Sequence, residues 1–193
     1  MHEKYTTRGL IISASPYREA DKIISIFTED FGLVSAVAAG VRRSASKLRY
    51  HAQDYSVRLF SLVRGRDLWR FVGAEEISGV DKIKNDACLT AYARVLSLVR
   101  RLVRGEEKNE VVFQTLFSFH AILASVVDAE DINAAETLAV FRILHALGYI
   151  KADASTEALI SQPSIDFALV KAARPLVLSL VAGINAGLAE SHL

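Results

Sequence analysis

The residues with the strongest chemical character are basic side chains clustered between residues 42 and 70. This window holds eight basic and two acidic residues, a net charge of +6, although the whole chain of 193 residues carries only +1. The basic residues that fall in its two predicted loops are Arg42, Arg43, Lys47, Arg49, Arg64 and Arg66. The fork of an arginine side chain matches phosphate oxygens bidentately. The aromatic residues of the window could stack on bases; they are Tyr50, Tyr55, Phe60 and Trp69. The window therefore predicts nucleic-acid binding; the alternative is a pair of solvated, charged loops.

A second group of arginines lies along one predicted helix. Its members are Arg94, Arg100, Arg101 and Arg104. Residues four apart share a helix face, so Arg100 and Arg104 would lie together, with Arg101 beside them. This group predicts a surface for a partner protein or a second DNA patch. The alternative is that these cations complement the dipole at the end of the helix.

Residues suited to catalysis or to metal binding form no recognisable set. None of the five histidines is part of an HxxxH pair, and the single cysteine, Cys88, has no histidine at local spacing. The sequence contains no Walker A or GxGxxG phosphate-binding motif. A single cysteine also excludes an internal disulfide framework and a cysteine-rich zinc site. We therefore expect a protein that is not an enzyme and has no catalytic residue, metal, cofactor or small-molecule substrate.

The elements that must position the basic window are short strands in hairpin order. Apolar, β-branched runs that end at turn residues predict strands, here over residues 8–15, 22–28, 33–38, 55–63 and 68–72. The basic loop 40–49 follows the third strand, and Arg64 to Asp67 forms the turn between the fourth and fifth. Five such strands are typical of an OB-fold barrel, whose loops flank a nucleic-acid groove. An SH3-like barrel is the alternative, because strand count alone does not separate the two.

From residue 81 onward the apolar residues recur with the period of a helix. We predict helices over residues 81–104, 110–127 and 134–147, a short helical turn over 155–160, and a final helix from about Ser164 that Pro175 should kink or restart. Asn133, with Glu136 three residues later, resembles a capping box, and Gly148 is the predicted helix stop. The fold class is α+β, with a five-stranded OB-fold domain (1–78) packed on an all-α domain of about four or five helices (79–193).

The hydropathy pattern is that of a folded, soluble chain. Apolar residues make up 51% and the mean hydropathy is +0.25, which excludes a disordered chain. The N-terminus lacks a secretory signal pattern. The longest uncharged run, Val111 to Val127, has 17 residues and is too short and too polar to span a bilayer. We expect a cytoplasmic protein without a membrane partner.

Four short motifs follow one another in the first 47 residues. They are Arg8-Gly-Leu-Ile-Ile, Pro16-Tyr17-Arg-Glu19-Ala-Asp21-Lys22, Phe27-Thr28-Glu-Asp-Phe-Gly32 and Gly40-Val-Arg42-Arg43-Ser-Ala-Ser46-Lys47. In this order and at this spacing they resemble the N-terminal signature of the RecO family of DNA-repair recombination mediators. A weaker resemblance continues as far as Leu147-Gly148-Tyr149, which looks like a helix end of that family.

The resemblance implies a non-enzymatic protein of DNA repair and recombination, with an N-terminal OB-fold. It implies binding to single- and double-stranded DNA, annealing of complementary strands, and a nucleoid-associated location in the cytoplasm. It also implies two protein partners, a RecR-type protein for recombinase loading and the C-terminal tail of single-strand-binding protein. The DNA-binding role carries over to Arg42, Arg43 and Lys47, whereas the helix arginines are not carried over.

The sequence departs from the family in two places. Many relatives have a basic residue where this chain has Ala39, and many have a cysteine-rich zinc module where residues 150–163 contain no cysteine. We therefore expect a short form without the zinc module. Two other functions stay open at this point: a protein–protein adaptor that acts through its helices, and an OB-type RNA-binding protein.

Overall fold

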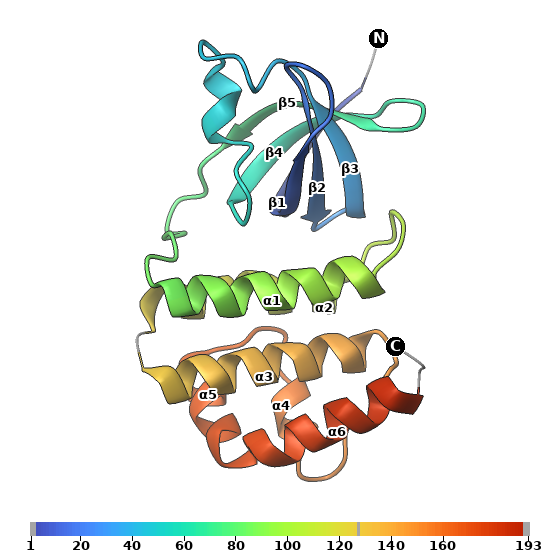
Figure 1. Ribbon diagram of the computed structural model, residues 1–193. Helices are drawn as coiled ribbons and strands as arrows, with labels where there is room; N and C mark the ends of the chain where they lie inside the picture. The colour runs from blue at the N-terminus through green and yellow to red at the C-terminus, as the bar shows by residue number, and fades with distance from the viewer. Residues whose placement is uncertain (1–2, 127, 191–193) are drawn as a thin grey trace. The chain divides into compact units, whose positions relative to one another are not determined.

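The computed structural model describes residues 3–126 and 128–190, which form two compact units. The first unit contains the residues up to Val80 together with Arg100–Asn109, and the second contains Asp81–Val99 and the residues from Glu110 onward. Figure 1 shows the strands of the first unit curled into a barrel and the second unit built from helices. The fold is therefore α+β, as the sequence predicted.

The barrel is formed by five strands whose order is β1-β2-β3-β5-β4. Their bounds are β1 Lys4–Pro16, β2 Lys22–Thr28, β3 Gly32–Ala38, β4 Val57–Val63 and β5 Trp69–Glu75. The long β1 pairs antiparallel with both β2 and β4 and so closes the sheet. The β3–β5 pairing is parallel, from Ala36 opposite Trp69 to Val37 opposite Arg70. This order is a closed Greek-key barrel, which identifies the OB-fold and removes the SH3-like alternative.

Alternating side chains from all five strands fill the barrel. Ile24, Ile26, Val34 and Phe60 are fully buried there, and Trp69 is 2% exposed. The predicted strands were correct in position, although β1 begins four residues earlier than expected. Trp69 and Phe71, on one face of β5, are both buried and so pack in the core rather than stack on bases.

The second unit consists of helices. Their bounds are α1 Asp86–Leu102, α2 Glu110–Ser125, α3 Ala129–Ala146, α4 Glu157–Ile160, α5 Phe167–Ala173 and α6 Val177–Glu190. The last residues of α1, from Arg100 onward, belong to the first unit. The stripe predicted on α1 is buried, from Cys88 and Tyr92 to Val99. Pro175 lies in a 3-10 turn, η2 (Arg174–Leu176), between α5 and α6, so the helix restarts after Pro175, the second of the two predicted outcomes. The predicted end of the second helix at Val127 lies outside the described residues.

The predicted start of the third helix was wrong. The helix α3 begins at Ala129, and Asp128 is its N-cap because its carboxylate accepts the N–H of Glu130. Asn133 therefore lies inside the helix and caps nothing. Asp131, expected in a loop, is buried and accepts hydrogen bonds from Lys171 and Arg174. Gly148 does follow the helix, in the left-handed region with φ = +79°, as predicted.

One helical stretch, Phe167–Glu190, is long and apolar enough by length and composition to cross a membrane, with a mean hydropathy of 1.7 in its most apolar window. A single stretch of this kind is weak evidence for a membrane span, since a core helix of a soluble protein passes the same test. The 3-10 turn at Pro175 interrupts it. The run that the sequence singled out, from Val111 onward, is the shorter helix α2.

Candidate nucleic-acid interface

The basic loop between β3 and β4 starts with a tight turn held by the β1–β2 connection. Gly40 has φ = +67°, a conformation that glycine adopts without strain. Its N–H donates to the carboxylate of Asp21 at 2.8 Å, and the N–H of Arg42 donates to the carbonyl of Ala20 at 3.0 Å. The two loops that end this side of the barrel are therefore tied together.

Apolar side chains anchor the same loop in the barrel. Val41 and Ala52, at its two ends, are 2% and 1% exposed and belong to the barrel core. Between them, a 3-10 turn, η1 (Lys47–Tyr50), places Leu48 against that core. Because the apolar positions face inward, the polar positions between them face solvent. The apolar anchors thus fix the backbone of the loop, and the cations between them point to solvent.

The structure exposes all four cations that were predicted on this loop. Arg42, Arg43, Lys47 and Arg49 are exposed, and within residues 3–126 and 128–190 no ion pair involves any of them. Arg42 donates from one terminal nitrogen to the carbonyl of Arg18 at 3.1 Å, which leaves its other donors available. Unpaired cations attract phosphate more strongly than cations that already have a carboxylate partner.

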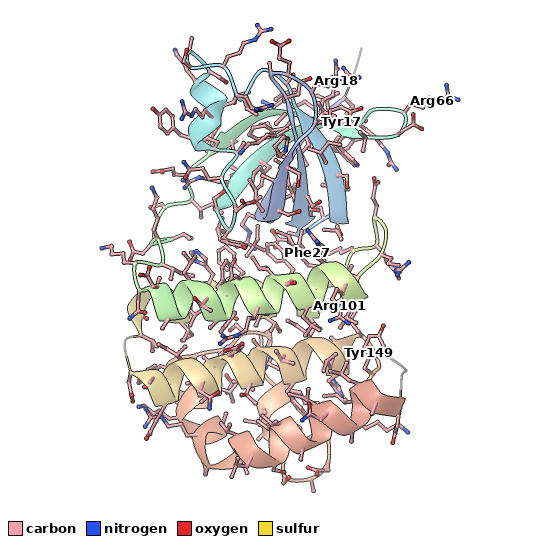
Figure 2. All side chains as sticks on the ribbon, in the orientation of Figure 1. Tyr17, Arg18, Phe27, Arg66, Arg101 and Tyr149 are labelled. Atoms are coloured by element: carbon pink, nitrogen blue, oxygen red, sulfur yellow. The ribbon has the colours of Figure 1, made fainter. Side chains whose placement is uncertain are left out.

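Three residues at this end of the barrel were missed by the sequence reasoning. Lys22, at the start of β2, lines a cavity of about 280 Å³ together with Val41, Arg42, Arg49 and Ala52. Tyr17 and Arg18, on the β1–β2 loop, are exposed, and the Arg18 guanidinium lies 5.0 Å from the Tyr17 ring centre (Figure 2). The signal was available, because the motif from Pro16 to Lys22 occupies the loop that borders the groove of an OB-fold.

The two arginines of the β4–β5 turn differ in their surroundings. Glu106 accepts from both the Trp69 indole N–H at 2.8 Å and Arg64 at 3.2 Å, and the Arg64 guanidinium lies 5.5 Å from the Trp69 ring centre. Arg64 is therefore held by a carboxylate. Arg66 is exposed, and Figure 2 shows it at the tip of the hairpin, pointing away from the barrel. The structure does not bring these two residues together with the β3–β4 loop.

The aromatic residues at this end of the chain differ in their exposure to solvent. Phe60 and Trp69 are buried. Tyr50, at the end of η1, is 69% exposed, and Tyr17 is 43% exposed. These two tyrosines, on the two tied loops, are available for stacking.

The predicted arginine group on α1 is divided in the same way. Arg94 makes two hydrogen bonds of 2.6 Å to Glu136, and these bonds raise the pKa of Arg94. Arg100, Arg101 and Arg104 are exposed, and among the described residues they have no ion pair. Only these last three have side chains that a partner could reach unopposed.

Groups that could do chemistry are sparse in the described part of the chain. It contains no cluster of three or more histidine, cysteine, aspartate or glutamate side chains that could hold a metal ion. Cys88 is buried, its thiol donates to the carbonyl of Val126, and burial raises its pKa. Burial lowers the pKa of His120 to about 4. Both groups belong to the helical core rather than to an open site.

Comparison with known proteins supports the resemblance seen in the N-terminal motifs. Residues 1–80 match the family model described as "Recombination protein O N terminal", which covers the whole barrel and its basic loop. The N-terminal barrel of the chain is therefore similar to the N-terminal part of RecO-family proteins. The resemblance carried by the N-terminal motifs is therefore confirmed.

Individual RecO relatives extend the match into the helices. Proteins named DNA repair protein RecO are 30% identical in Gloeothece citriformis, over 60% of this chain and 41% of the relative, and 30% identical in Bacillus mycoides, over 65% and 51%. The protein of that name in Dehalococcoides mccartyi is 32% identical, over 65% of this chain and 50% of its own. The chain thus spans about half the length of the curated relatives it matches.

Proposed function

We propose that this chain acts as a RecO-family protein: a non-enzymatic DNA-binding protein of recombinational repair that holds single- and double-stranded DNA on the β3–β4 end of its barrel. The observation that carries the proposal is a set of four exposed cations that have no ion pair among the described residues, on a loop anchored by Val41 and Ala52; they are Arg42, Arg43, Lys47 and Arg49. A fixed loop binds phosphates without first losing conformational entropy. Arg66, on its separate hairpin, would act as an outlying contact.

In this proposal the contacts are to the sugar–phosphate backbone and to base faces, so binding does not depend on sequence. The four cations would neutralise successive phosphates and release their counterions. Tyr50 and Tyr17 would stack on bases of a single strand, at about 1–3 kcal/mol per base. Binding that ignores sequence is what a protein that anneals complementary strands requires, because it must accept any strand.

The experiment is a fluorescence anisotropy titration of one oligonucleotide across a salt series. Each neutralised phosphate of a single strand contributes about −0.7 to the slope of log K against log salt. The triple variant Arg42→Ala, Arg43→Ala, Lys47→Ala should therefore flatten the slope by about 2. The matched control is Lys82→Ala, Lys84→Ala, Lys108→Ala, which removes the same charge from exposed positions elsewhere. Equal affinity and slope for the triple variant and the wild type would show that the loop is not the DNA site.

The same titration tests the RNA-binding alternative. An RNA oligonucleotide of matching sequence should bind no more tightly than the DNA, because backbone phosphates and base faces are common to both. A strong preference for RNA would favour the alternative, since RNA is distinguished by its 2′-hydroxyl.

We further propose that the partners are a RecR-type protein, for recombinase loading, and the acidic C-terminal tail of single-strand-binding protein, which together place the protein at the nucleoid in the cytoplasm. Three exposed cations, Arg100, Arg101 and Arg104, support attraction of an acidic tail. A labelled tail peptide should lose affinity for the variant Arg100→Ala, Arg101→Ala, Arg104→Ala but not for the lysine control. Tail-dependent capture without measurable DNA binding would favour the adaptor function instead.

A further inference from the structure

The basic end of the barrel is hollowed as well as charged. The cavity of about 280 Å³ is lined by Lys22, Arg42 and Arg49, with the buried Val41 and Ala52 also in its lining. Its volume lies just below the roughly 300–1,000 Å³ of pockets that bury drug-sized ligands. It is therefore large enough for one small group such as a phosphate.

Three separate elements supply the three cations. Lys22 begins β2, Arg42 follows the turn at Gly40, and Arg49 lies on η1. The backbone at each point is fixed, by the β2–β3 pairing of Lys22 with Ala38, by the bond from the Arg42 N–H to Ala20, and by the bond from the Arg49 N–H to Ser46. The nearby carboxylate of Asp21 already accepts from the Gly40 N–H and does not line the cavity.

The charge of the cavity suits a phosphate monoester better than a diester. A terminal phosphate carries about −1.5 to −2 charges at pH 7 and offers three strong acceptor oxygens, whereas a phosphodiester within a strand carries one charge. The three cations that line the cavity together have enough donors for the three oxygens of a monoester, although one Arg42 nitrogen also donates to the Arg18 carbonyl.

We propose that this cavity binds a phosphate monoester, and that its source is the phosphorylated end of a DNA strand. The inference rests on the proposed DNA-binding function and adds preference for strand ends to it. Cations outside the cavity lining, such as Arg43 and Lys47, would hold the strand that leads away from the bound end. The protein would thus distinguish a nicked or resected end from the middle of a strand.

The experiment compares three oligonucleotides of one sequence, with a 5′-phosphate, with a 3′-phosphate, and with hydroxyls at both ends. The wild type should bind one of the phosphorylated forms about tenfold more tightly than the hydroxyl form. The variant Lys22→Gln should reduce this ratio toward one, because it should weaken binding of the phosphorylated form more than binding of the hydroxyl form. The control Arg43→Ala, on the same loop but outside the cavity lining, should weaken binding to all three forms equally and keep the ratio.

A second measurement does not depend on DNA binding. Addition of dAMP, a free monoester, should shift the amide NMR signals of Val41 and Ala52 in the wild type but not in Lys22→Gln. Equal affinity for the three oligonucleotides together with a dAMP response would show that the monoester comes from a free nucleotide, and would overturn the strand-end assignment. Equal affinity with no dAMP response would overturn the cavity as a monoester site while DNA binding stands, and absence of all DNA binding would overturn the proposed function itself.

Discussion

Replacing Arg142 with methionine should destabilise the helical unit more than any change to an exposed arginine. Arg142 lies on α3, is 1% exposed, and faces no carboxylate among the described residues. Its guanidinium donates to the carbonyls of Leu159 at 2.7 Å, Gln162 at 2.5 Å and Pro163 at 3.1 Å, and to the Thr115 hydroxyl at 3.3 Å. One side chain therefore fastens the segment after α4 to both α2 and α3.

The size of the effect follows from these bonds. A hydrogen bond to a charged group contributes about 1.5–3 kcal/mol, so the two shortest would together contribute about 3–6 kcal/mol. Gln162 and Pro163 are exposed, and water can replace part of what their carbonyls lose. Methionine also avoids the cost of burying a charge, which lowers the pKa of Arg142. We therefore expect a loss of about 3 kcal/mol, near the lower end of that range.

Urea denaturation followed by circular dichroism at 222 nm measures this loss. With a slope of about 1–3 kcal/mol per molar urea, the midpoint should fall by roughly 1–3 M. The control is Arg94→Met, since Arg94 is exposed and its pair with Glu136 should contribute at most about 1 kcal/mol. If the two variants lose equal stability, the buried guanidinium does not hold the segment and the reasoning fails.

Two further predictions concern single side chains. The variant Glu106→Gln keeps an acceptor for the Trp69 indole but releases Arg64, so the salt slope of DNA binding should steepen by up to about 0.7. The control Glu107→Gln removes the same charge from the neighbouring residue, and an equal change of slope in the control would contradict the release of Arg64. His120 is buried with a pKa of about 4 against 6.5 in an unfolded chain, so the unfolded state binds more protons below pH 6.5 and stability must fall as the pH falls toward 4. Between pH 7 and pH 5 the wild type should lose about 2 kcal/mol of unfolding free energy through this group, and His120→Leu, measured in the same buffers, should lose less by that amount.

The barrel was readable from the sequence because its strands are short, β-branched and separated by turn residues. The start of α3 was not, and its case shows why. Asp128 and Asn133 are both good N-caps, and local sequence offers no reason to reject the second. With the start at Ala129, Asp131 lies in the first turn of α3 and accepts hydrogen bonds from Lys171 and Arg174. Burial alone would raise the pKa of Asp131, but these hydrogen bonds outweigh burial and lower it. Those partners lie about 40 residues away and are invisible to a local pattern.

A similar limit applies to residues 100–109. The sequence assigned them to the helical domain, but they form a compact unit with the barrel. Residues 100–109 closely approach the turn between β2 and β3, since a Cβ on Gly32 would lie 2.1 Å from the carbonyl oxygen of Glu107. Gly32 also has φ = +64°, so both the turn and the contact require glycine. A hairpin signal predicts the first requirement and says nothing of the second.

The charge count of the basic window illustrates how pairing changes the meaning of a sequence sum. Of its eight cations, Arg58 is buried beside Glu76 at 3.3 Å, and Arg64 is held by Glu106. Both carboxylates lie outside the window, so the count of +6 overstates the charge that a phosphate would meet. The cations that stay unpaired in the described residues are concentrated where Gly40, Val41 and Ala52 fix the loop. An interface is therefore better located by combining charge with the anchoring of its backbone than by charge alone, and this combination, rather than the sum, selects the β3–β4 loop.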